Sequence, residues 1–80
     1  MIKARVTVTL KNGVLDPRGK AIEGALGRLG FEGVHQVRGG KVFDLEVETG
    51  DRAKAEEEIK AMCEKLLANT VIENYSISLA

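Results

Sequence analysis

The sequence predicts an α+β fold, and three observations carry that prediction. Residues 2–10 alternate apolar and polar side chains without a break, which is the period-2 pattern of a half-buried strand. Residues 17–29 instead repeat apolar side chains at helical spacing. Two extended runs, 34–38 and 41–48, flank Gly39-Gly40, and a pair of glycines between such runs is typical of a β-hairpin.

The first strand leads into the first helix through a loop with clear start signals. Asp16 is expected to be the N-cap, because its carboxylate can accept a hydrogen bond from a free backbone N–H of the first turn. Pro17 then falls at the first helical position, where its missing N–H costs nothing. The helix is predicted to end at Leu29, with Gly30 as the C′ residue in the left-handed conformation.

The second half of the chain repeats this scheme. Asp51 is the predicted N-cap of a second helix that runs to Leu67 or Ala68, and a last strand is expected from Val71 to Leu79. The resulting order, β-α-β-β-α-β, is that of a ferredoxin-like two-layer sandwich. We therefore expect one domain, residues 1–80, with a four-stranded antiparallel sheet in the order 4-1-3-2 and both helices on one face.

The polar sides of two strands support this register. Lys3 and Arg5 on the first strand would lie across from the acidic side chains of the third, Asp44, Glu46 and Glu48. Opposite charges on neighbouring strands attract, although an exposed pair adds only a few tenths of a kcal/mol. The pattern therefore favours the register more than it stabilises the sheet.

Composition excludes several classes of function. Twelve basic and twelve acidic residues give a net charge of zero, which argues against a non-specific nucleic-acid binder. The single cysteine, Cys63, cannot form an internal disulfide, and no long apolar run or signal peptide is visible. We expect a cytoplasmic protein that binds no membrane. Its small core and few aromatic residues also predict self-association.

No catalytic or metal-binding set is visible in the sequence. His35 is the only histidine and is expected on a hairpin strand, and Cys63 lies on the apolar stripe of the second helix. The run Glu56-Glu57-Glu58 spreads around that helix as a solvated face, with no neighbouring ligand to complete a metal site. The chain itself is therefore expected to have no catalytic residue, no bound cofactor and no metal.

Two loops leave alternatives open. Residues 38–41, Arg-Gly-Gly-Lys, present two cations and two flexible amides, so they form either a backbone nest for an anion or a plain hairpin turn. Leu15 either packs on the first turn of the helix as a hydrophobic staple or stays exposed as an apolar contact for a partner.

Three stretches together resemble the PurS family, the small subunit of phosphoribosylformylglycinamidine (FGAM) synthase. They are residues 10–17 (LKNGVLDP), residues 37–41 (VRGGK) and residues 62–75 (MCEKLLANTVIENY). The match spans nearly the whole chain. Thr70 departs from the family pattern, which usually has proline after asparagine at this point.

The resemblance implies the following expectations. The complete enzyme converts formylglycinamide ribonucleotide, ATP and glutamine to FGAM in de novo purine synthesis. A glutaminase subunit releases ammonia, and a large synthetase subunit uses ATP and Mg to activate the formamide oxygen. A PurS-like chain would form a homodimer or a tetramer, bridge the large and glutaminase subunits, and shield ammonia in transit.

We therefore expect the family-like loops to contact the other subunits. These candidate interface residues are Gly13, Val14, Leu15, Asp16, Pro17, Arg38, Gly39, Gly40, Lys41, Asn69, Val71, Ile72 and Glu73.

The alternative is a ligand-binding regulatory module of the ACT type, which shares the element order. Such modules often have Asp, Pro and Gly in the first strand-to-helix loop, where Arg18 here separates Pro17 from Gly19. An RNA-recognition domain on the same scaffold is rejected, because the outward positions of the central strands carry no aromatic residue.

Overall fold

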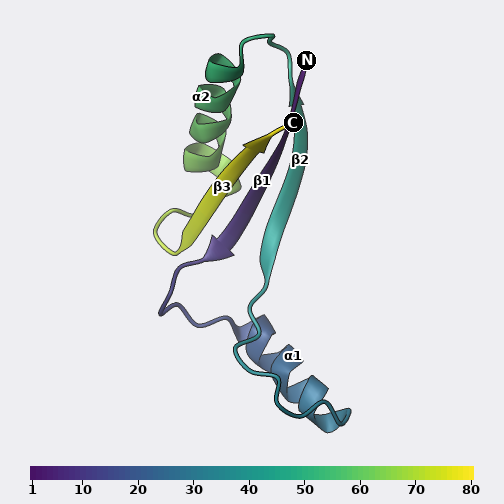
Figure 1. The fold of residues 1–80 in the computed structure, drawn as a ribbon. Helices are drawn as coiled ribbons and strands as arrows, with labels where there is room; N and C mark the ends of the chain where they lie inside the picture. The colour runs from purple at the N-terminus through teal and green to yellow at the C-terminus, as the bar shows by residue number, and fades with distance from the viewer.

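The computed structural model describes all 80 residues and divides them into two unequal parts. The elements are β1 (Ile2–Leu10), α1 (Pro17–Arg28), β2 (Gly40–Val47), α2 (Arg52–Met62), the π-helical turn η1 (Cys63–Leu67) and β3 (Glu73–Leu79). A sheet covered by α2 and η1 forms one part, which we call the body (Figure 1). Residues 17–38, which comprise α1 and the segment that follows it, form the other part, which we call the arm.

The sheet of the body is antiparallel and has three strands in the order β2-β1-β3. The central strand pairs Arg5 with Asp44 of β2 on one side and with Ser78 of β3 on the other. The alternation predicted for β1 is confirmed, because its even-numbered residues from Ile2 to Val8 are buried while Lys3 and Arg5 are exposed.

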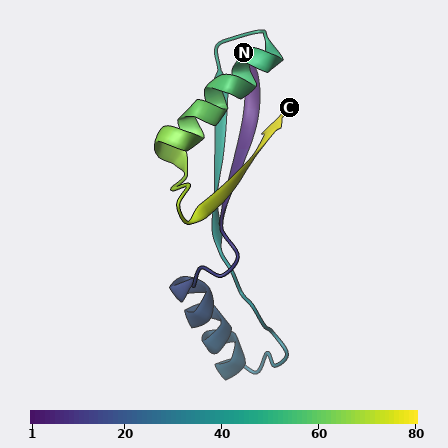
Figure 2. The ribbon, with the colours of Figure 1, turned by 90° about the vertical axis from the view of Figure 1, so that its left-hand side faces the viewer.

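The hydrophobic core lies between the sheet and α2. Val6 and Val8 of β1 are fully buried against Ile59 of α2 and Cys63 of η1. Figure 2 shows α2 crossing one face of the sheet, while the other face carries no helix. Only five hydrophobic residues of the chain, these four and Ala55, have no exposed surface, so the core is small, as expected for a domain of this length.

The arm extends away from this core. Figure 1 shows α1 beyond the end of the sheet, with the following segment running back alongside it to enter β2. The molecule is therefore elongated, with principal extents of 50 × 24 × 15 Å. Gly19 is the only buried residue of α1.

The four-stranded sheet predicted from the sequence is wrong, because residues 34–38 form no strand. Gly33 and Gln36 adopt positive φ angles of 85° and 56°, so the backbone leaves the extended conformation twice within four residues. Gly39-Gly40 is accordingly not a hairpin turn. Gly40 is the first residue of β2 and pairs with Thr9.

The placement of both helices on one face of the sheet is also wrong. Only α2 covers the sheet, and α1 lies beyond its end (Figure 2). The backbone N–H of Gly39 donates to the carboxylate of Asp16 at 2.7 Å, which ties the start of α1 to the start of β2. The helix therefore begins at the end of the sheet, beside the start of β2, and runs away from it.

The predicted helix ends are largely confirmed. Asp16 caps α1, and Gly30 ends it at φ 95°, with the N–H of Phe31 donating to the carbonyl of Leu26 at 2.9 Å as in a Schellman motif. Asp51 caps α2, which gives way to the π-helical turn after Met62. The last strand begins at residue 73, two residues later than predicted. No helix has the length and apolar character that crossing a membrane requires.

Candidate functional site: the junction between arm and sheet

Three loops that are distant in sequence meet at the end of the sheet where the arm begins. They are residues 11–17, residues 37–41 and residues 69–73, and we call this meeting place the junction. Lys11 donates its backbone N–H to the carbonyl of Ile72 at 2.9 Å, which joins the first loop to the third. All thirteen candidate interface residues predicted from the sequence lie in these three loops.

The carboxylate of Asp16 is the centre of the junction. It accepts backbone hydrogen bonds from Gly39 at 2.7 Å and from Gly19 at 2.9 Å, and the residue is only 8% exposed. These two hydrogen bonds, the one from Gly39 first, hold the pKa of the carboxyl below its ordinary value of 3.8. The ionised side chain of Asp16 therefore caps α1 and also binds the backbone of Gly39, where the chain returns from the arm to β2.

Neither interpretation of residues 38–41, the hairpin turn or the anion nest, describes the structure. Arg38 donates from its guanidinium to the carbonyl oxygens of Lys11 at 3.1 Å and Val14 at 2.8 Å. The N–H of Gly39 is already bound to Asp16. These donors hold a carboxylate and two carbonyls of the chain itself, so they leave no free nest for an external anion.

Gly19 is a junction residue that the sequence reasoning missed. A Cβ atom at this position would collide with the carbonyl oxygen of Val37, so only glycine allows the two backbones to approach. A glycine in the first turn of a helix, where it lowers helix propensity, was the available signal. Gly24 and Gly27, which lie further along the same helix, meet no neighbouring backbone.

The third loop is held rigidly by its own side chains. Glu73 accepts from the N–H of Asn69 at 2.6 Å, and Asn69 accepts in turn from the N–H of Val71 at 3.2 Å. The Nζ atom of Lys41 lies 3.5 Å from Oε2 of Glu73. The pKa of Glu73 is lowered, mainly because its carboxylate accepts the hydrogen bond from the N–H of Asn69. The loop therefore presents Val71 to solvent, 80% exposed, on an ordered backbone.

Leu15 adds a second apolar side chain to the surface of the junction. Leu15 is 66% exposed, and this exposure favours an apolar contact for a partner over a hydrophobic staple. Two exposed apolar side chains on backbones fixed by hydrogen bonds are suited to binding, because little conformational entropy remains to be lost.

The chemistry of the site is that of a contact surface. Burial raises the pKa of the Cys63 thiol, which keeps it protonated and unreactive inside the core. His35 is exposed on the arm, and no group of three or more His, Cys, Asp or Glu side chains could hold a metal ion. The junction offers a fixed backbone and exposed apolar side chains. Its charged groups Asp16, Arg38 and Glu73 are bound to backbone atoms, and Glu73 also pairs with Lys41.

Known proteins resemble this chain over nearly its whole length. The family model described as PurS, phosphoribosylformylglycinamidine (FGAM) synthase, matches residues 3–80. The PurS subunit of Archaeoglobus fulgidus is 53% identical over 74 residues, which is 92% of each chain. That of Synechocystis is 52% identical over 71 residues, or 89% of this chain and 71% of the relative.

Solved structures give the same result. Bacillus subtilis PurS superposes with a TM-score of 0.91 at 46% identity, covering 100% of this chain and 99% of the other. A chain in the structure of PurLQS from Thermotoga maritima superposes with a TM-score of 0.89 at 38% identity, covering 99% and 96%. The solved chains therefore share the arm and the body together, since the superposition covers both.

Proposed function

Because this chain belongs to the PurS family of FGAM synthase subunits, which act in purine biosynthesis, we propose that it serves as a non-catalytic bridge in that complex. In this role it holds the large synthetase subunit and the glutaminase subunit together, so that ammonia released by one reaches the other without loss. ATP and Mg are bound by the large subunit, and the complex works in the cytoplasm.

The junction carries this proposal. Its three loops hold most of the residues by which the sequence resembles the family, and their polar groups are largely engaged in fixing the junction itself. The side chains of Leu15 and Val71 are exposed and carry no polar atom, so only the backbone of Val71 contributes to those hydrogen bonds. A surface that is internally rigid and externally apolar favours docking of another protein over chemistry on a small molecule.

Substitution of the two exposed apolar residues tests the bridge. Leu15→Glu and Val71→Glu place a charge in an apolar contact without breaking a hydrogen bond of the junction, so both variants should fold. In the reconstituted complex we expect glutamine-dependent FGAM synthesis to fall at least tenfold at limiting subunit concentration, while synthesis from added ammonia is retained. Ala53→Glu, at an exposed position of α2, is the matched control.

The two kinds of activity separate the possible outcomes. Loss of the glutamine-dependent reaction alone supports a bridge between subunits. Unchanged activity and unchanged co-elution of both junction variants would remove the junction from the proposal. If the isolated chain hydrolysed glutamine or ATP, a non-catalytic role would be contradicted.

The arm supports a second part of the proposal, self-association. Its exposed side includes Ile22, which is 43% exposed, and Leu29, which is 73% exposed. On the sheet, Phe43 and Leu45 of β2 are only partly buried on the face that α2 covers, since α2 packs mainly against β3. Asp16 holds α1 away from that face, so α1 of a second copy is the element that would cover it.

The mass of the particle tests this part. We expect a dimer at micromolar concentration in sedimentation velocity, and a monomer for the double variant Ile22→Glu/Leu29→Glu. The control is again Ala53→Glu, which adds one charge outside the arm. A monomeric wild-type chain, or a double variant that remains dimeric, would contradict association through the arm.

A further inference from the structure

The pair Asn12-Gly13 lies in the turn that follows β1, within the first loop of the junction. Val14 donates its N–H to the carbonyl of Lys11 at 3.2 Å, and of the two central residues only Gly13 has a positive φ, 85°, so residues 11–14 form a type II turn. Gly13 is exposed, and a Cβ atom there would meet nothing within 4 Å. A glycine after an asparagine leaves the way open for its backbone nitrogen to approach the asparagine side chain.

The two groups that would react are not engaged elsewhere in the chain. The side-chain amide of Asn12 makes no hydrogen bond, and the backbone N–H of Gly13 donates to no acceptor. The other two asparagines of the chain are held in place. The side chain of Asn69 accepts from the N–H of Val71 at 3.2 Å, and Asn74 lies within β3, whose backbone is fixed by pairing with β1. Asn12 is therefore the asparagine most open to attack by its own backbone.

We propose that Asn12 is a site of spontaneous covalent modification that loosens the arm. The backbone nitrogen of Gly13 attacks Cγ of Asn12 and closes a five-membered succinimide ring. The side-chain nitrogen leaves as ammonia and takes the proton of the Gly13 N–H with it. Water then opens the ring at one of its two carbonyl carbons. Breaking the bond from nitrogen to Cγ gives aspartate, and breaking the bond from nitrogen to the main-chain carbonyl carbon gives isoaspartate. Water is the only co-reactant.

Arg38 controls how often this ring can close. Its Nη2 atom donates to the carbonyl oxygens of Lys11 at 3.1 Å and Val14 at 2.8 Å, the two residues that flank the reacting pair. We call these two hydrogen bonds the Arg38 clasp. A type II turn holds ψ of its second residue, here Asn12, near about 120°, whereas the planar ring needs the Gly13 nitrogen turned to the side of Cβ. That rotation moves the two carbonyls apart, so the reaction proceeds only while the clasp is open.

The two products change the junction differently. Aspartate at position 12 adds a negative charge and keeps the length of the main chain. Isoaspartate also adds one methylene group to the main chain between Lys11 and Val14, so Arg38 no longer reaches both carbonyls in hydrogen-bonding geometry. Asp16, through Gly39, is then the one side chain that joins the first loop of the junction to the second. Isoaspartate formation therefore weakens the attachment of the arm irreversibly as the protein ages.

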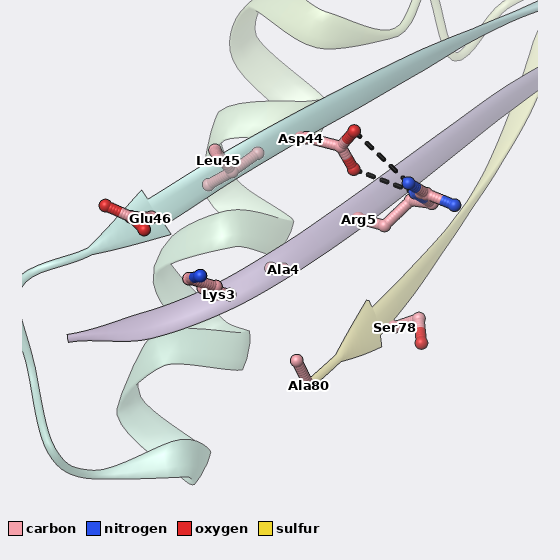
Figure 3. Close-up of a pocket in the computed structure, with 8 residues that line it drawn as sticks. All are labelled: Lys3, Ala4, Arg5, Asp44, Leu45, Glu46, Ser78 and Ala80. Carbon is pink, nitrogen blue, oxygen red and sulfur yellow. Dashed lines mark hydrogen bonds and ion pairs between the residues drawn. The ribbon is translucent and has the colours of Figure 1, made fainter.

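Peptide mapping by mass spectrometry tests the site. After incubation at physiological temperature and mildly alkaline pH, we expect Asn12 to gain about 1 Da, because water replaces ammonia, before Asn69 or Asn74 changes. Arg38→Ala should speed this reaction roughly tenfold, because the clasp consists of two hydrogen bonds from a charged donor. The matched control is Arg5→Ala, which also removes two guanidinium hydrogen bonds, those to Asp44 in the middle of the sheet (Figure 3), and should leave the rate unchanged.

Hydrogen–deuterium exchange of residues 20–28 tests the effect on the arm, in modified and unmodified fractions separated by ion exchange. We expect faster exchange in the isoaspartate fraction, while Asn12→Gln, which closes the larger ring slowly, keeps its protection through the same incubation. Equal rates in Arg38→Ala and the wild-type chain would overturn control by the clasp.

Two further outcomes would overturn the site itself: earlier modification of Asn69 or Asn74, and an isoaspartate fraction whose arm exchanges as slowly as the unmodified one. The comparison of the three asparagines uses the wild-type chain, so it does not depend on how well a variant folds. All of these measurements use the chain alone, and they are therefore independent of the proposed role of the junction.

Discussion

The body and the arm are built from the same kinds of sequence pattern, yet they differ in where their apolar side chains end up. The stripe of α2 places Ile59 in the core at zero exposure, whereas the stripe of α1 leaves Leu29 almost three-quarters exposed. Both helices have a capping aspartate and helical spacing of apolar residues. Their difference shows that an amphipathic stripe predicts an apolar helix face but does not say what covers that face.

The largest expected effect is on the free energy of unfolding, which should fall for a truncation in the body but not for one in the arm. Ile59→Ala removes a fully buried side chain from the only core, and we expect it to lower the free energy of unfolding by about 3 kcal/mol. Leu29→Ala should change it by less than about 0.5 kcal/mol in a monomeric sample, because that side chain has no packing to lose. Urea denaturation at two protein concentrations measures both. Equal losses at both positions would show that the arm is packed within its own chain.

A pair of glycine substitutions sharpens the comparison within the arm. Gly19→Ala forces a Cβ atom against the Val37 carbonyl, so we expect a loss of about 1–3 kcal/mol in unfolding free energy. Gly27→Ala meets nothing within 4 Å, and we expect a gain of up to about 1 kcal/mol from helix propensity. Thermal unfolding followed by circular dichroism is the measurement. A harmless Gly19→Ala would mean that the arm does not depend on close approach at the junction.

The smallest effect concerns pH. The pKa of Asp16 is lowered in the folded chain, so the folded state binds fewer protons than the unfolded state. Its contribution is complete above the ordinary value of 3.8 and is lost as pH falls through the lower folded value. Asp16→Asn should therefore lower the melting temperature by roughly 4 °C at pH 7, with a difference that shrinks below pH 4. A difference that grows toward acid pH would contradict this sign.

Much of the local structure could be predicted from the sequence, because it is decided by neighbours in the chain. The cap at Asp16, the glycine ending at Gly30 and the pairing of Arg5 with Asp44 all follow from residue chemistry and periodicity. The family resemblance likewise identified the three loops that form the junction. They meet at one place because the antiparallel topology brings the C-terminal end of β1 beside the N-terminal ends of β2 and β3.

The placement of α1 and the missing strand could not be predicted in the same way. Gly39-Gly40 satisfied the rule for a hairpin, but the competing hydrogen bond from Gly39 to Asp16 is a contact across more than twenty residues. The positive φ of Gln36 has no clear sequence signal. The apolar stripe of α1 predicts packing on its own sheet, and the structure does not follow, because sequence spacing carries no information about where a helix is placed.

Helix α1 packs on no other element of its own chain, and we propose that it gains a partner from a second copy. Hydrogen–deuterium exchange followed by mass spectrometry measures this directly, at concentrations above and below the dissociation of the dimer. We predict that backbone amides of residues 20–28 are protected only in the concentrated sample, while those of β1 are protected in both. Equal protection of α1 at both concentrations, with the dilute sample verified to be monomeric, would contradict the account.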